Sequence, residues 1–277
     1  ATEFEKLGIT LPTNLADFQA AAATAAAQGK YIADFTADET GYWLSAQTAA
    51  AGGSWYGVAD GAWEVTVQSK AAATVADFWQ KMLDDKTVLT HDRWADTYSK
   101  AMTDGQLIGN IAAAWEVAFA LDAVDGTAYE GQWRVAQIPD FGAGAKTGPD
   151  GGSGVAVMKG CQYPAQAMEF NDWFNTQVDD LFSQGLVTAA TKAPTKTPEK
   201  MTRQFGGQDI IPVLTTANKN MPQNFVYIPG MGSVVPQVVT AATDVVAGTK
   251  KVSEIFDAGQ TASVTALKDL GLKSTEG

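Results

Sequence analysis

The sequence predicts an α/β fold, in which helices cover a sheet of short strands. Helical patterns of apolar residues alternate along the chain with short runs of β-branched, aromatic and small residues. Such alternation favours a layered α/β architecture over a helical bundle or a β-sandwich. The 277 residues, 45% of them hydrophobic, are enough to bury a substantial core, as one large domain or as two lobes.

Helix starts are marked by capping residues and by proline. Thr13 or Asn14 can cap a helix that runs to Gln28, because a short polar side chain there accepts a hydrogen bond from the first free amides. Proline is tolerated in a first helical turn, where its missing N–H has no partner to lose. The predicted helices begin near Asn14, Ser69, Trp94, Pro164, Pro198 and Val252.

The strand candidates are short and lie between these helices. Each is a run of apolar or β-branched residues bounded by turn residues. The predicted strands span residues 31–35, 64–67, 107–114, 133–138 and 154–158. Two connectors, 139–152 and 188–198, are candidate hinges or lobe boundaries.

Trp115 directly follows the most clearly bounded of these strands. Residues 104–116 read DGQLIGNIAAAWE, in which Asp104-Gly105 ends a helical pattern and an apolar run leads to the tryptophan. Ligands of open α/β sheets lie outside the carboxyl ends of the strands, so Trp115 is predicted to face a crevice. The alternative is that Trp115 packs in the core, as large aromatic side chains often do.

The net charge of −12 and the pI near 4.5 argue against a nucleic acid or an anionic lipid surface as a partner. Cys161 is the only cysteine, which excludes an internal disulfide and a thiolate-rich metal cluster. No apolar run approaches the roughly 20 residues that a membrane span needs. The first residues lack the charged start and apolar block of a signal peptide, so either the protein is cytosolic or its true N-terminus is absent.

Motifs for nucleotide binding or covalent catalysis are missing. His91, the only histidine, has no Gly-x-Ser-x-Gly elbow and is predicted to lie at a polar helix start, while residues 142–147 (GAGAKT) do not lead into the helix of a phosphate-binding loop. Carboxylate pairs such as Glu116 and Asp122 are predicted to be surface charge, although a glycosidase would need two such groups across a crevice. Aromatic side chains near turns remain, and these can stack on sugar rings without any cofactor.

Several segments carry a resemblance to a known family, in that family's order along essentially the whole chain. They are 4–13 (FEKLGITLPT), 49–53 (AAAGG), 104–115 (DGQLIGNIAAAW), 133–139 (WRVAQIP), 151–157 (GGSGVAV) and 205–208 (FGGQ). On these segments the chain resembles the extracellular sugar-binding proteins of bacterial ABC importers, the broad group that includes maltose-binding protein. The family's usual tryptophan after the Pro-Thr helix start is replaced here by Asn14-Leu15.

The resemblance implies a two-lobe, type II periplasmic-binding-protein-like fold, of which this chain holds mostly the second lobe and part of the first. Residues 1–134 and 188–277 would build the second lobe and 135–187 would belong to the first, with hinge crossings near 133–139 and 185–192. Because the match begins partway through the family pattern, the chain is expected to lack its N-terminal portion. The first-lobe segment would then expose apolar surface, from Trp173, Phe174 and Leu181.

Trp115 matches the family's aromatic residue that stacks on a sugar ring, which favours binding over core packing. Gly151, Gly152 and Ser153 match a loop whose backbone can approach a ligand closely, although a plain tight turn is nearly as good an interpretation.

Further candidates lie at two helix starts and at one turn. Glu39 and Tyr42 fall where the family has a helix start facing the cleft, and they are expected to contact hydroxyls and to stack. Met231 falls at another such start, where Val235 and Pro236 replace aromatic residues of some members. Two neighbouring aromatics either line the cleft rim or close their turn, namely Trp55 and Tyr56.

The function that the resemblance implies is reversible, non-catalytic binding of a mono- or oligosaccharide for an ABC transporter. The expected partners are the carbohydrate, the membrane permease and the missing N-terminal lobe of the same protein, with no nucleic acid, metal or cofactor. The protein would be an extracellular lipoprotein or periplasmic. Two alternatives stay open: a carbohydrate-active hydrolase that uses Glu39 or Glu116, and a binding protein for a non-sugar solute such as a peptide or a polyol.

Overall fold

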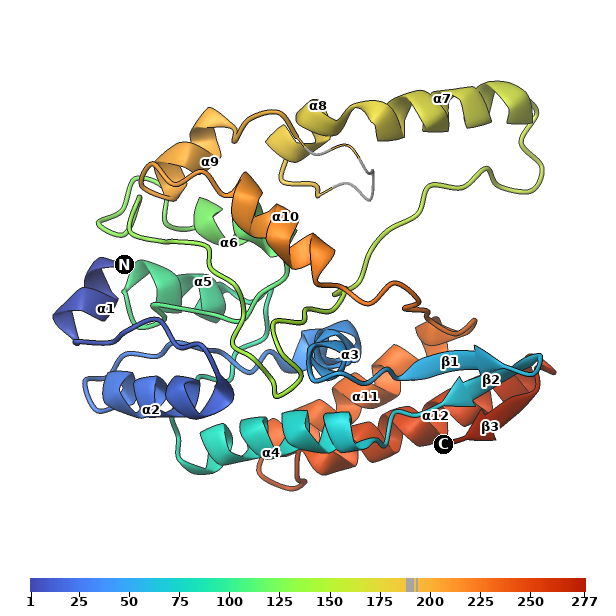
Figure 1. Ribbon diagram of the computed structural model, residues 1–277, viewed down its shortest axis with the longest axis horizontal. Helices are drawn as coiled ribbons and strands as arrows, with labels where there is room; N and C mark the ends of the chain where they lie inside the picture. The colour runs from blue at the N-terminus through green and yellow to red at the C-terminus, as the bar shows by residue number, and fades with distance from the viewer. Residues whose placement is uncertain (188–191, 193) are drawn as a thin grey trace.

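The computed structural model describes residues 1–187, 192 and 194–277, and of residues 118–120 the backbone alone (Figure 1). Its helices are α1 (Thr2–Lys6), α2 (Leu15–Ala26), the 3-10 helix η1 (Ala37–Glu39), α3 (Thr40–Ala50), α4 (Lys70–Asp84), α5 (Asp96–Thr103), α6 (Glu116–Asp122), α7 (Pro164–Thr176), α8 (Val178–Ser183), α9 (Glu199–Gln204), α10 (Ile211–Lys219), α11 (Met231–Val246) and α12 (Ser253–Asp269). Its strands are β1 (Tyr56–Ala59), β2 (Ala62–Val65) and β3 (Ser274–Glu276). The predicted connector 188–198 and the predicted hinge crossing 185–192 lie partly outside the described residues.

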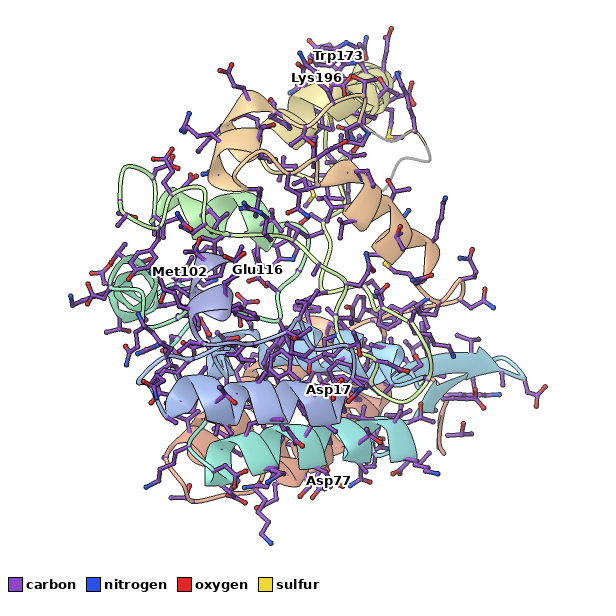
Figure 2. All side chains as sticks on the ribbon, turned by 60° about the vertical axis from the view of Figure 1, so that its left-hand side comes forward. Asp17, Asp77, Met102, Glu116, Trp173 and Lys196 are labelled. Carbon is purple, nitrogen blue, oxygen red and sulfur yellow. The ribbon has the colours of Figure 1, made fainter. Side chains whose placement is uncertain are left out.

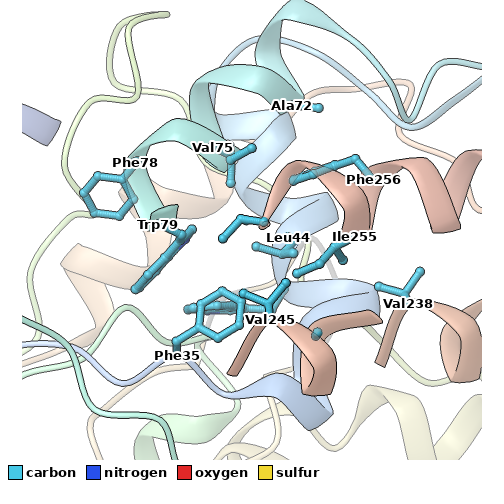
Figure 3. Close-up of a cluster of buried hydrophobic side chains, with 14 of the residues drawn as sticks. Phe35, Leu44, Ala72, Val75, Phe78, Trp79, Val238, Val245, Ile255 and Phe256 are labelled. Atoms are coloured by element: carbon cyan, nitrogen blue, oxygen red, sulfur yellow. The ribbon is translucent and has the colours of Figure 1, made fainter. Parts of the chain in front are cut away.

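Helix α3 is the centre of the main hydrophobic core. All of its residues except Tyr42 are buried, because α4 and α11 pack against it. Figure 3 shows Leu44 of α3 surrounded by apolar side chains from α4, α11 and α12. Trp43 packs against Phe35 and Trp79, with ring centroids 5.8 Å and 4.7 Å away. Burial on nearly all sides of a helix is typical of the centre of a large core.

The only regular sheet among the described residues lies beside this helical core. Strands β1 and β2 form a hairpin in which Tyr56 is opposite Val65, and β3 joins β2 in parallel. The hairpin turn uses Asp60 and Gly61, both with positive φ (51° and 73°), as a mirror-image two-residue turn requires. The strand predicted at 64–67 therefore begins earlier, at Ala62, and ends at Val65.

The other four predicted strands are wrong, since the structure has no regular strand at 31–35, 107–114, 133–138 or 154–158. The first two segments run side by side but pair only at a parallel bridge between Tyr31 and Leu107. Further along, the Asn110 side chain, rather than a backbone oxygen, accepts a hydrogen bond from the Asp34 amide (3.4 Å). A strand is defined by its partner, and none of the four finds a continuous partner among the described residues.

The helix predictions are largely confirmed, because their signals are local. The Asn14 side chain accepts from the Asp17 amide at 2.9 Å, and the Ser69 hydroxyl accepts from the Ala72 amide at 3.2 Å. Helices also begin at Pro164, after Pro198 and after Val252. The exception is the helix expected from Trp94: α5 begins at Asp96, so His91 and Trp94 precede it instead of lying on it.

Helix α7 and the segment leading to it belong neither to the main core nor to a second, smaller apolar core. A second apolar cluster joins α5, α6, α8 and α9, and it contains Met102, Phe182 and Phe205. Helix α7 has no buried residue, and Trp173 is 56% exposed at the opposite end of the molecule from Asp77 (Figure 2). The apolar exposure predicted for Trp173 is confirmed, whereas Phe174 and Leu181 are half-buried.

None of the described helices combines the length and hydropathy that crossing a membrane requires.

Candidate functional site

Two tryptophans from different segments form an aromatic pair near the start of α3. The rings of Trp94 and Trp115 are stacked at 6.0 Å between centroids, with an angle of 18° between their planes. Trp94 is 63% exposed and Trp115 is half-buried. Nearly parallel, partly exposed indole rings offer an apolar platform with polar N–H edges.

A buried ion pair joins the two segments that carry the tryptophans. Arg93, which precedes Trp94, pairs with Glu116, which follows Trp115, and both side chains are about 5% exposed. The Arg93 amide donates to both carboxylate oxygens of Asp38 at 2.9 Å. The segment before α5, the start of α6 and η1 are thus fixed to one another.

Glu39 completes one edge of the platform. It is half-buried at the junction of η1 and α3, and its Oε1 accepts a hydrogen bond from Trp94 Nε1 at 2.8 Å. Its carboxylate therefore orients the exposed indole ring. The hydrogen bond leaves the second carboxylate oxygen available for another donor.

The loop before residue 151 closes the opposite edge. Trp115 Nε1 donates to the backbone oxygen of Asp150 at 3.0 Å, and the Tyr227 hydroxyl donates to the backbone oxygen of Pro149 at 3.1 Å. Burial and the charge of Glu39 raise the pKa of Asp150 to about 7. Burial also raises the pKa of Tyr227 well above its ordinary value, so this hydroxyl stays protonated.

Tyr42 links this loop to helix α3. Its ring meets the Tyr227 ring edge to face at 5.3 Å between centroids. Gly151 and Gly152 follow Asp150 with φ values of 73° and 130°, a conformation that glycine adopts readily. Ser153 comes next and is exposed.

The structure brings together four of the nine predicted ligand-binding residues and separates others from them. Glu39, Tyr42, Trp115 and Gly151 lie around one cluster, which we call the aromatic site. Its members are Glu39, Tyr42, Trp94, Trp115, Asp150, Gly151 and Tyr227. Whether these residues bind a ligand stays a prediction.

Three predicted residues belong to the core instead. Trp55 is fully buried and donates from Nε1 to the Thr48 hydroxyl at 3.1 Å, while Tyr56 shares a 2.8 Å hydrogen bond with Ser263. Met231 does begin α11, as predicted, but its side chain is packed in the main core. None of the three offers a side-chain surface to a cleft.

Sequence reasoning missed Trp94, Asp150 and Tyr227. Trp94 was assigned to a helix face, and neither Asp150 nor Tyr227 lies in a recognisable pattern. One signal was available: the dipeptides Arg93-Trp94 and Trp115-Glu116 place opposite charges next to the two tryptophans. An ion pair between them brings the rings together.

The two carboxyl groups of the predicted pair Glu116 and Asp122 lie in different surroundings. Glu116, at the start of α6, is buried against Arg93, so the prediction of surface charge is wrong for it, whereas Asp122 at the end of the helix faces Lys200 at 2.6 Å. His91 is not a helix cap, since its Nδ1 lies 2.8 Å from the buried carboxylate of Asp34. Among the described residues, no group of three or more potential ligands is arranged to hold a metal ion.

A cavity of about 480 Å³ lies on the far side of the ion pair. Met102 and Glu116, both labelled in Figure 2, contribute to its wall, together with Arg93 and Asn110. The rest of the lining is mainly apolar and comes from the N-terminal segment and from residues 133–139.

The comparisons with known proteins identify the family of the chain. The family model for bacterial extracellular solute-binding proteins matches residues 2–178. The galacto-N-biose-/lacto-N-biose I-binding protein of an ABC transporter from Bifidobacterium longum, solved with lacto-N-biose, is 46% identical with a TM-score of 0.93; the match covers 99% of this chain and 68% of that chain. No curated protein sequence matches the chain.

Two further solved structures share the fold. A binding protein associated with an ABC transporter of B. animalis subsp. lactis, solved with beta-1,6-galactobiose, is 22% identical with a TM-score of 0.83, covering 99% of this chain and 71% of that one. The GacH receptor of Streptomyces glaucescens is 17% identical with a TM-score of 0.69, covering 96% and 67%. The predicted type II binding-protein fold is confirmed, and the chain belongs to the bacterial extracellular solute-binding protein family.

Proposed function

We propose that this protein binds a short oligosaccharide reversibly at the aromatic site and delivers it to the permease of an ABC transporter. The observation that carries the proposal is the stacked pair of Trp94 and Trp115, in which one indole N–H donates to the Glu39 carboxylate and the other to the Asp150 backbone oxygen. Indole faces stack on the apolar faces of sugar rings, while carboxyl groups and backbone amides bind the hydroxyls. Lacto-N-biose and galacto-N-biose are the first ligands to test, because the 46% identical relative is named for binding them.

The proposed site is one wall of a cleft between two lobes. We assign residues 1–134 and 188–277 to the second lobe and 135–187 to the first. The main core supports joining the two second-lobe segments, because it combines residues from α2 to α4 with residues from α11 and α12; Phe141 of the segment 135–187 also packs in it. Further polypeptide of the same protein would cover the exposed aromatic residues of α7, and hinge closure between the lobes would enclose the ligand.

The remaining finer points belong to the same proposal. We place the protein outside the cell, anchored as a lipoprotein or free in a periplasm, because the matching family is extracellular. Gly152 and Ser153 would contact the ligand through their backbone, next to Gly151. The protein would act without catalysis, which agrees with the solute-binding role of its family and of its structural relatives.

The experiment is a titration of intrinsic tryptophan fluorescence with lacto-N-biose, galacto-N-biose and maltose up to millimolar concentrations. We expect a saturable change with at least one sugar, and its loss in Trp115→Leu, because the stacking platform is removed. Trp173→Ser is the matched control: it also removes one tryptophan, but far from the site (Figure 2). A sugar response that survives in Trp115→Leu, or none with any sugar in the unaltered chain, would contradict the proposal.

A further inference from the structure

The cavity beside the Arg93–Glu116 ion pair is lined by two segments that sequence predicts to be strands. Residues 108–110 and 112 contribute one part of its wall and residues 133–139 contribute another, and Ala1 also lines it. Neither segment finds a continuous strand partner among the described residues. Backbone N–H and C=O groups need hydrogen-bond partners wherever water is partly excluded, so the wall of this cavity can be searched for groups without one.

The backbone of residues 133–139 is paired along one edge only. Val135 donates its N–H to Gln208 Oε1 and accepts from Gln208 Nε2, both at 2.8 Å, as a strand residue bonds to a neighbouring strand. The next residue of a strand turns its polar groups to the opposite edge, and there Ala136 and Ile138 follow. Within residues 1–187, 192 and 194–277, the N–H and C=O groups of Ala136 and Ile138 make no hydrogen bond. Such an open edge is a template for an added strand.

Other polar groups of the cavity wall are unpaired as well. The Ile108 N–H donates to the Tyr31 oxygen at 2.8 Å, but the N–H and C=O of Gly109 find no partner in the part of the chain that the structure describes. Gln137 donates from Nε2 to the Val213 oxygen at 2.8 Å, whereas its Oε1 is buried and unpaired. Buried polar groups without partners are rare in folded proteins, so three such residues around one cavity indicate an occupant that donates and accepts hydrogen bonds.

An extended polypeptide fits this wall, because its own N–H and C=O groups repeat at the spacing of the open edge. The 46% identical relative contains more polypeptide than this chain, since the match covers 68% of it. The Ala1 amino group donates to the Gln132 oxygen at 2.5 Å, directly before the segment 133–139. Polypeptide joined to Ala1 would therefore reach the cavity where that segment begins.

We propose that the cavity receives a β-strand of the same protein, which is joined to Ala1 and runs antiparallel to residues 133–138. The strand would pair with Ala136 and Ile138 on one side and with Gly109 on the other, which makes it an internal strand. This inference rests on the proposed function, which gives the protein further polypeptide, and it specifies where that polypeptide enters the second lobe. The strand would also cover the ion pair that positions the two tryptophans, because Arg93 and Glu116 line the same cavity.

Amide hydrogen exchange, resolved by residue with NMR, tests the pairing without any sugar. The two samples are the 277-residue chain and the natural protein with the polypeptide that precedes Ala1. In the chain we expect the Ala136 amide to exchange at least about 100-fold faster than the paired Val135 amide. In the longer protein the two rates should come within about tenfold of each other. Comparing neighbouring amides within one sample removes the effect of a change in global stability.

A proline variant tests the same hydrogen bond by a second measurement. Ala136→Pro removes the N–H that the strand would use, so it should lower the midpoint of urea unfolding in the longer protein. In the 277-residue chain this N–H has no described partner, and the midpoint should stay the same. Val135→Pro is the matched control, because it removes an N–H that is paired with Gln208 in the chain itself, and it should lower the midpoint in both proteins.

The outcomes separate this inference from the proposed function. An Ala136 amide that stays about 100-fold faster than Val135 in the longer protein overturns the inference and leaves sugar binding standing. An Ala136→Pro variant that changes the midpoint equally in both proteins, or in neither, also overturns it. So does an intact mass showing that the natural protein begins at Ala1. Protection of Ala136 in a protein that responds to no sugar contradicts the proposed function and supports the strand.

Discussion

At the scale of single residues, the aromatic pair is positioned by two dipeptides, Arg93-Trp94 and Trp115-Glu116. The arginine and glutamate form an ion pair in the interior. Each is the direct neighbour of one tryptophan, so the ion pair fixes the positions of the two stacked rings. Buried ion pairs contribute little net stability, because desolvating both charges offsets their attraction. The pair at this site therefore serves better as a positioning device than as a source of stability.

This role predicts how the ion pair responds to mutation. Glu116→Ala leaves the Arg93 guanidinium buried and unpaired, and should lower the free energy of unfolding by about 3–5 kcal/mol. The double variant Arg93→Met/Glu116→Leu leaves no charge behind and should lose clearly less than the single variant. Urea unfolding followed by circular dichroism measures both. Equal losses in the single and double variants would mean that packing, and not the unpaired charge, sets the cost.

Helix positions follow from local sequence, whereas the strands and the site depend on distant contacts. Asn14 caps α2 through an amide three residues away, so sequence alone predicts it. Whether 107–114 forms a strand depends on its pairing with 31–35, and the two segments share only one bridge. Trp94 joins the site through contacts with Glu39 and Trp115 and through the ion pair of its neighbour Arg93 with Glu116, 23 positions further along the chain. No helical or strand period reveals such contacts.

At the scale of elements, one glycine, Gly148, allows the loop that carries Asp150 to pack closely against α3. A Cβ atom on Gly148 would lie 2.1 Å from the backbone oxygen of Ala46, so any side chain there must push the loop away from the helix. Gly148→Ala should therefore displace Asp150 and weaken sugar binding by more than tenfold. The displacement should also cost stability, because strain and overpacking typically cost about 1–3 kcal/mol.

Gly154→Ala is the matched control for this prediction. Gly154 lies in the same connecting segment, has no positive φ, and has nothing within 4 Å of an added Cβ. The variant should bind and unfold like the unaltered chain. The Kd for lacto-N-biose and the midpoint of urea unfolding, measured for both variants, test whether Gly148 is required for the position of the loop. Equal affinities would show that the loop adjusts without moving Asp150.

At the scale of the whole molecule, buried apolar contacts are distributed unevenly. The two packed cores contain them, whereas α7 lies outside both cores. Helix α7 contributes no buried residue, and the rings of Phe170 and Trp173 contact each other at 5.7 Å while both remain more than half exposed. Apolar surface of this kind promotes association, because covering it releases water. The fold itself gains little from these two rings.

Phe170→Ser/Trp173→Ser should therefore separate stability from association. The free energy of unfolding should change by no more than about 0.5 kcal/mol, the usual range for surface positions. Self-association, measured by sedimentation velocity over a range of protein concentrations, should decrease, and so should the binding of a hydrophobic dye. Glu169→Ser on the same exposed helix is the control and should leave both unchanged. A large loss of stability in the double variant would instead show that α7 packs against the described cores in solution, and would remove the reason to expect further polypeptide over this helix.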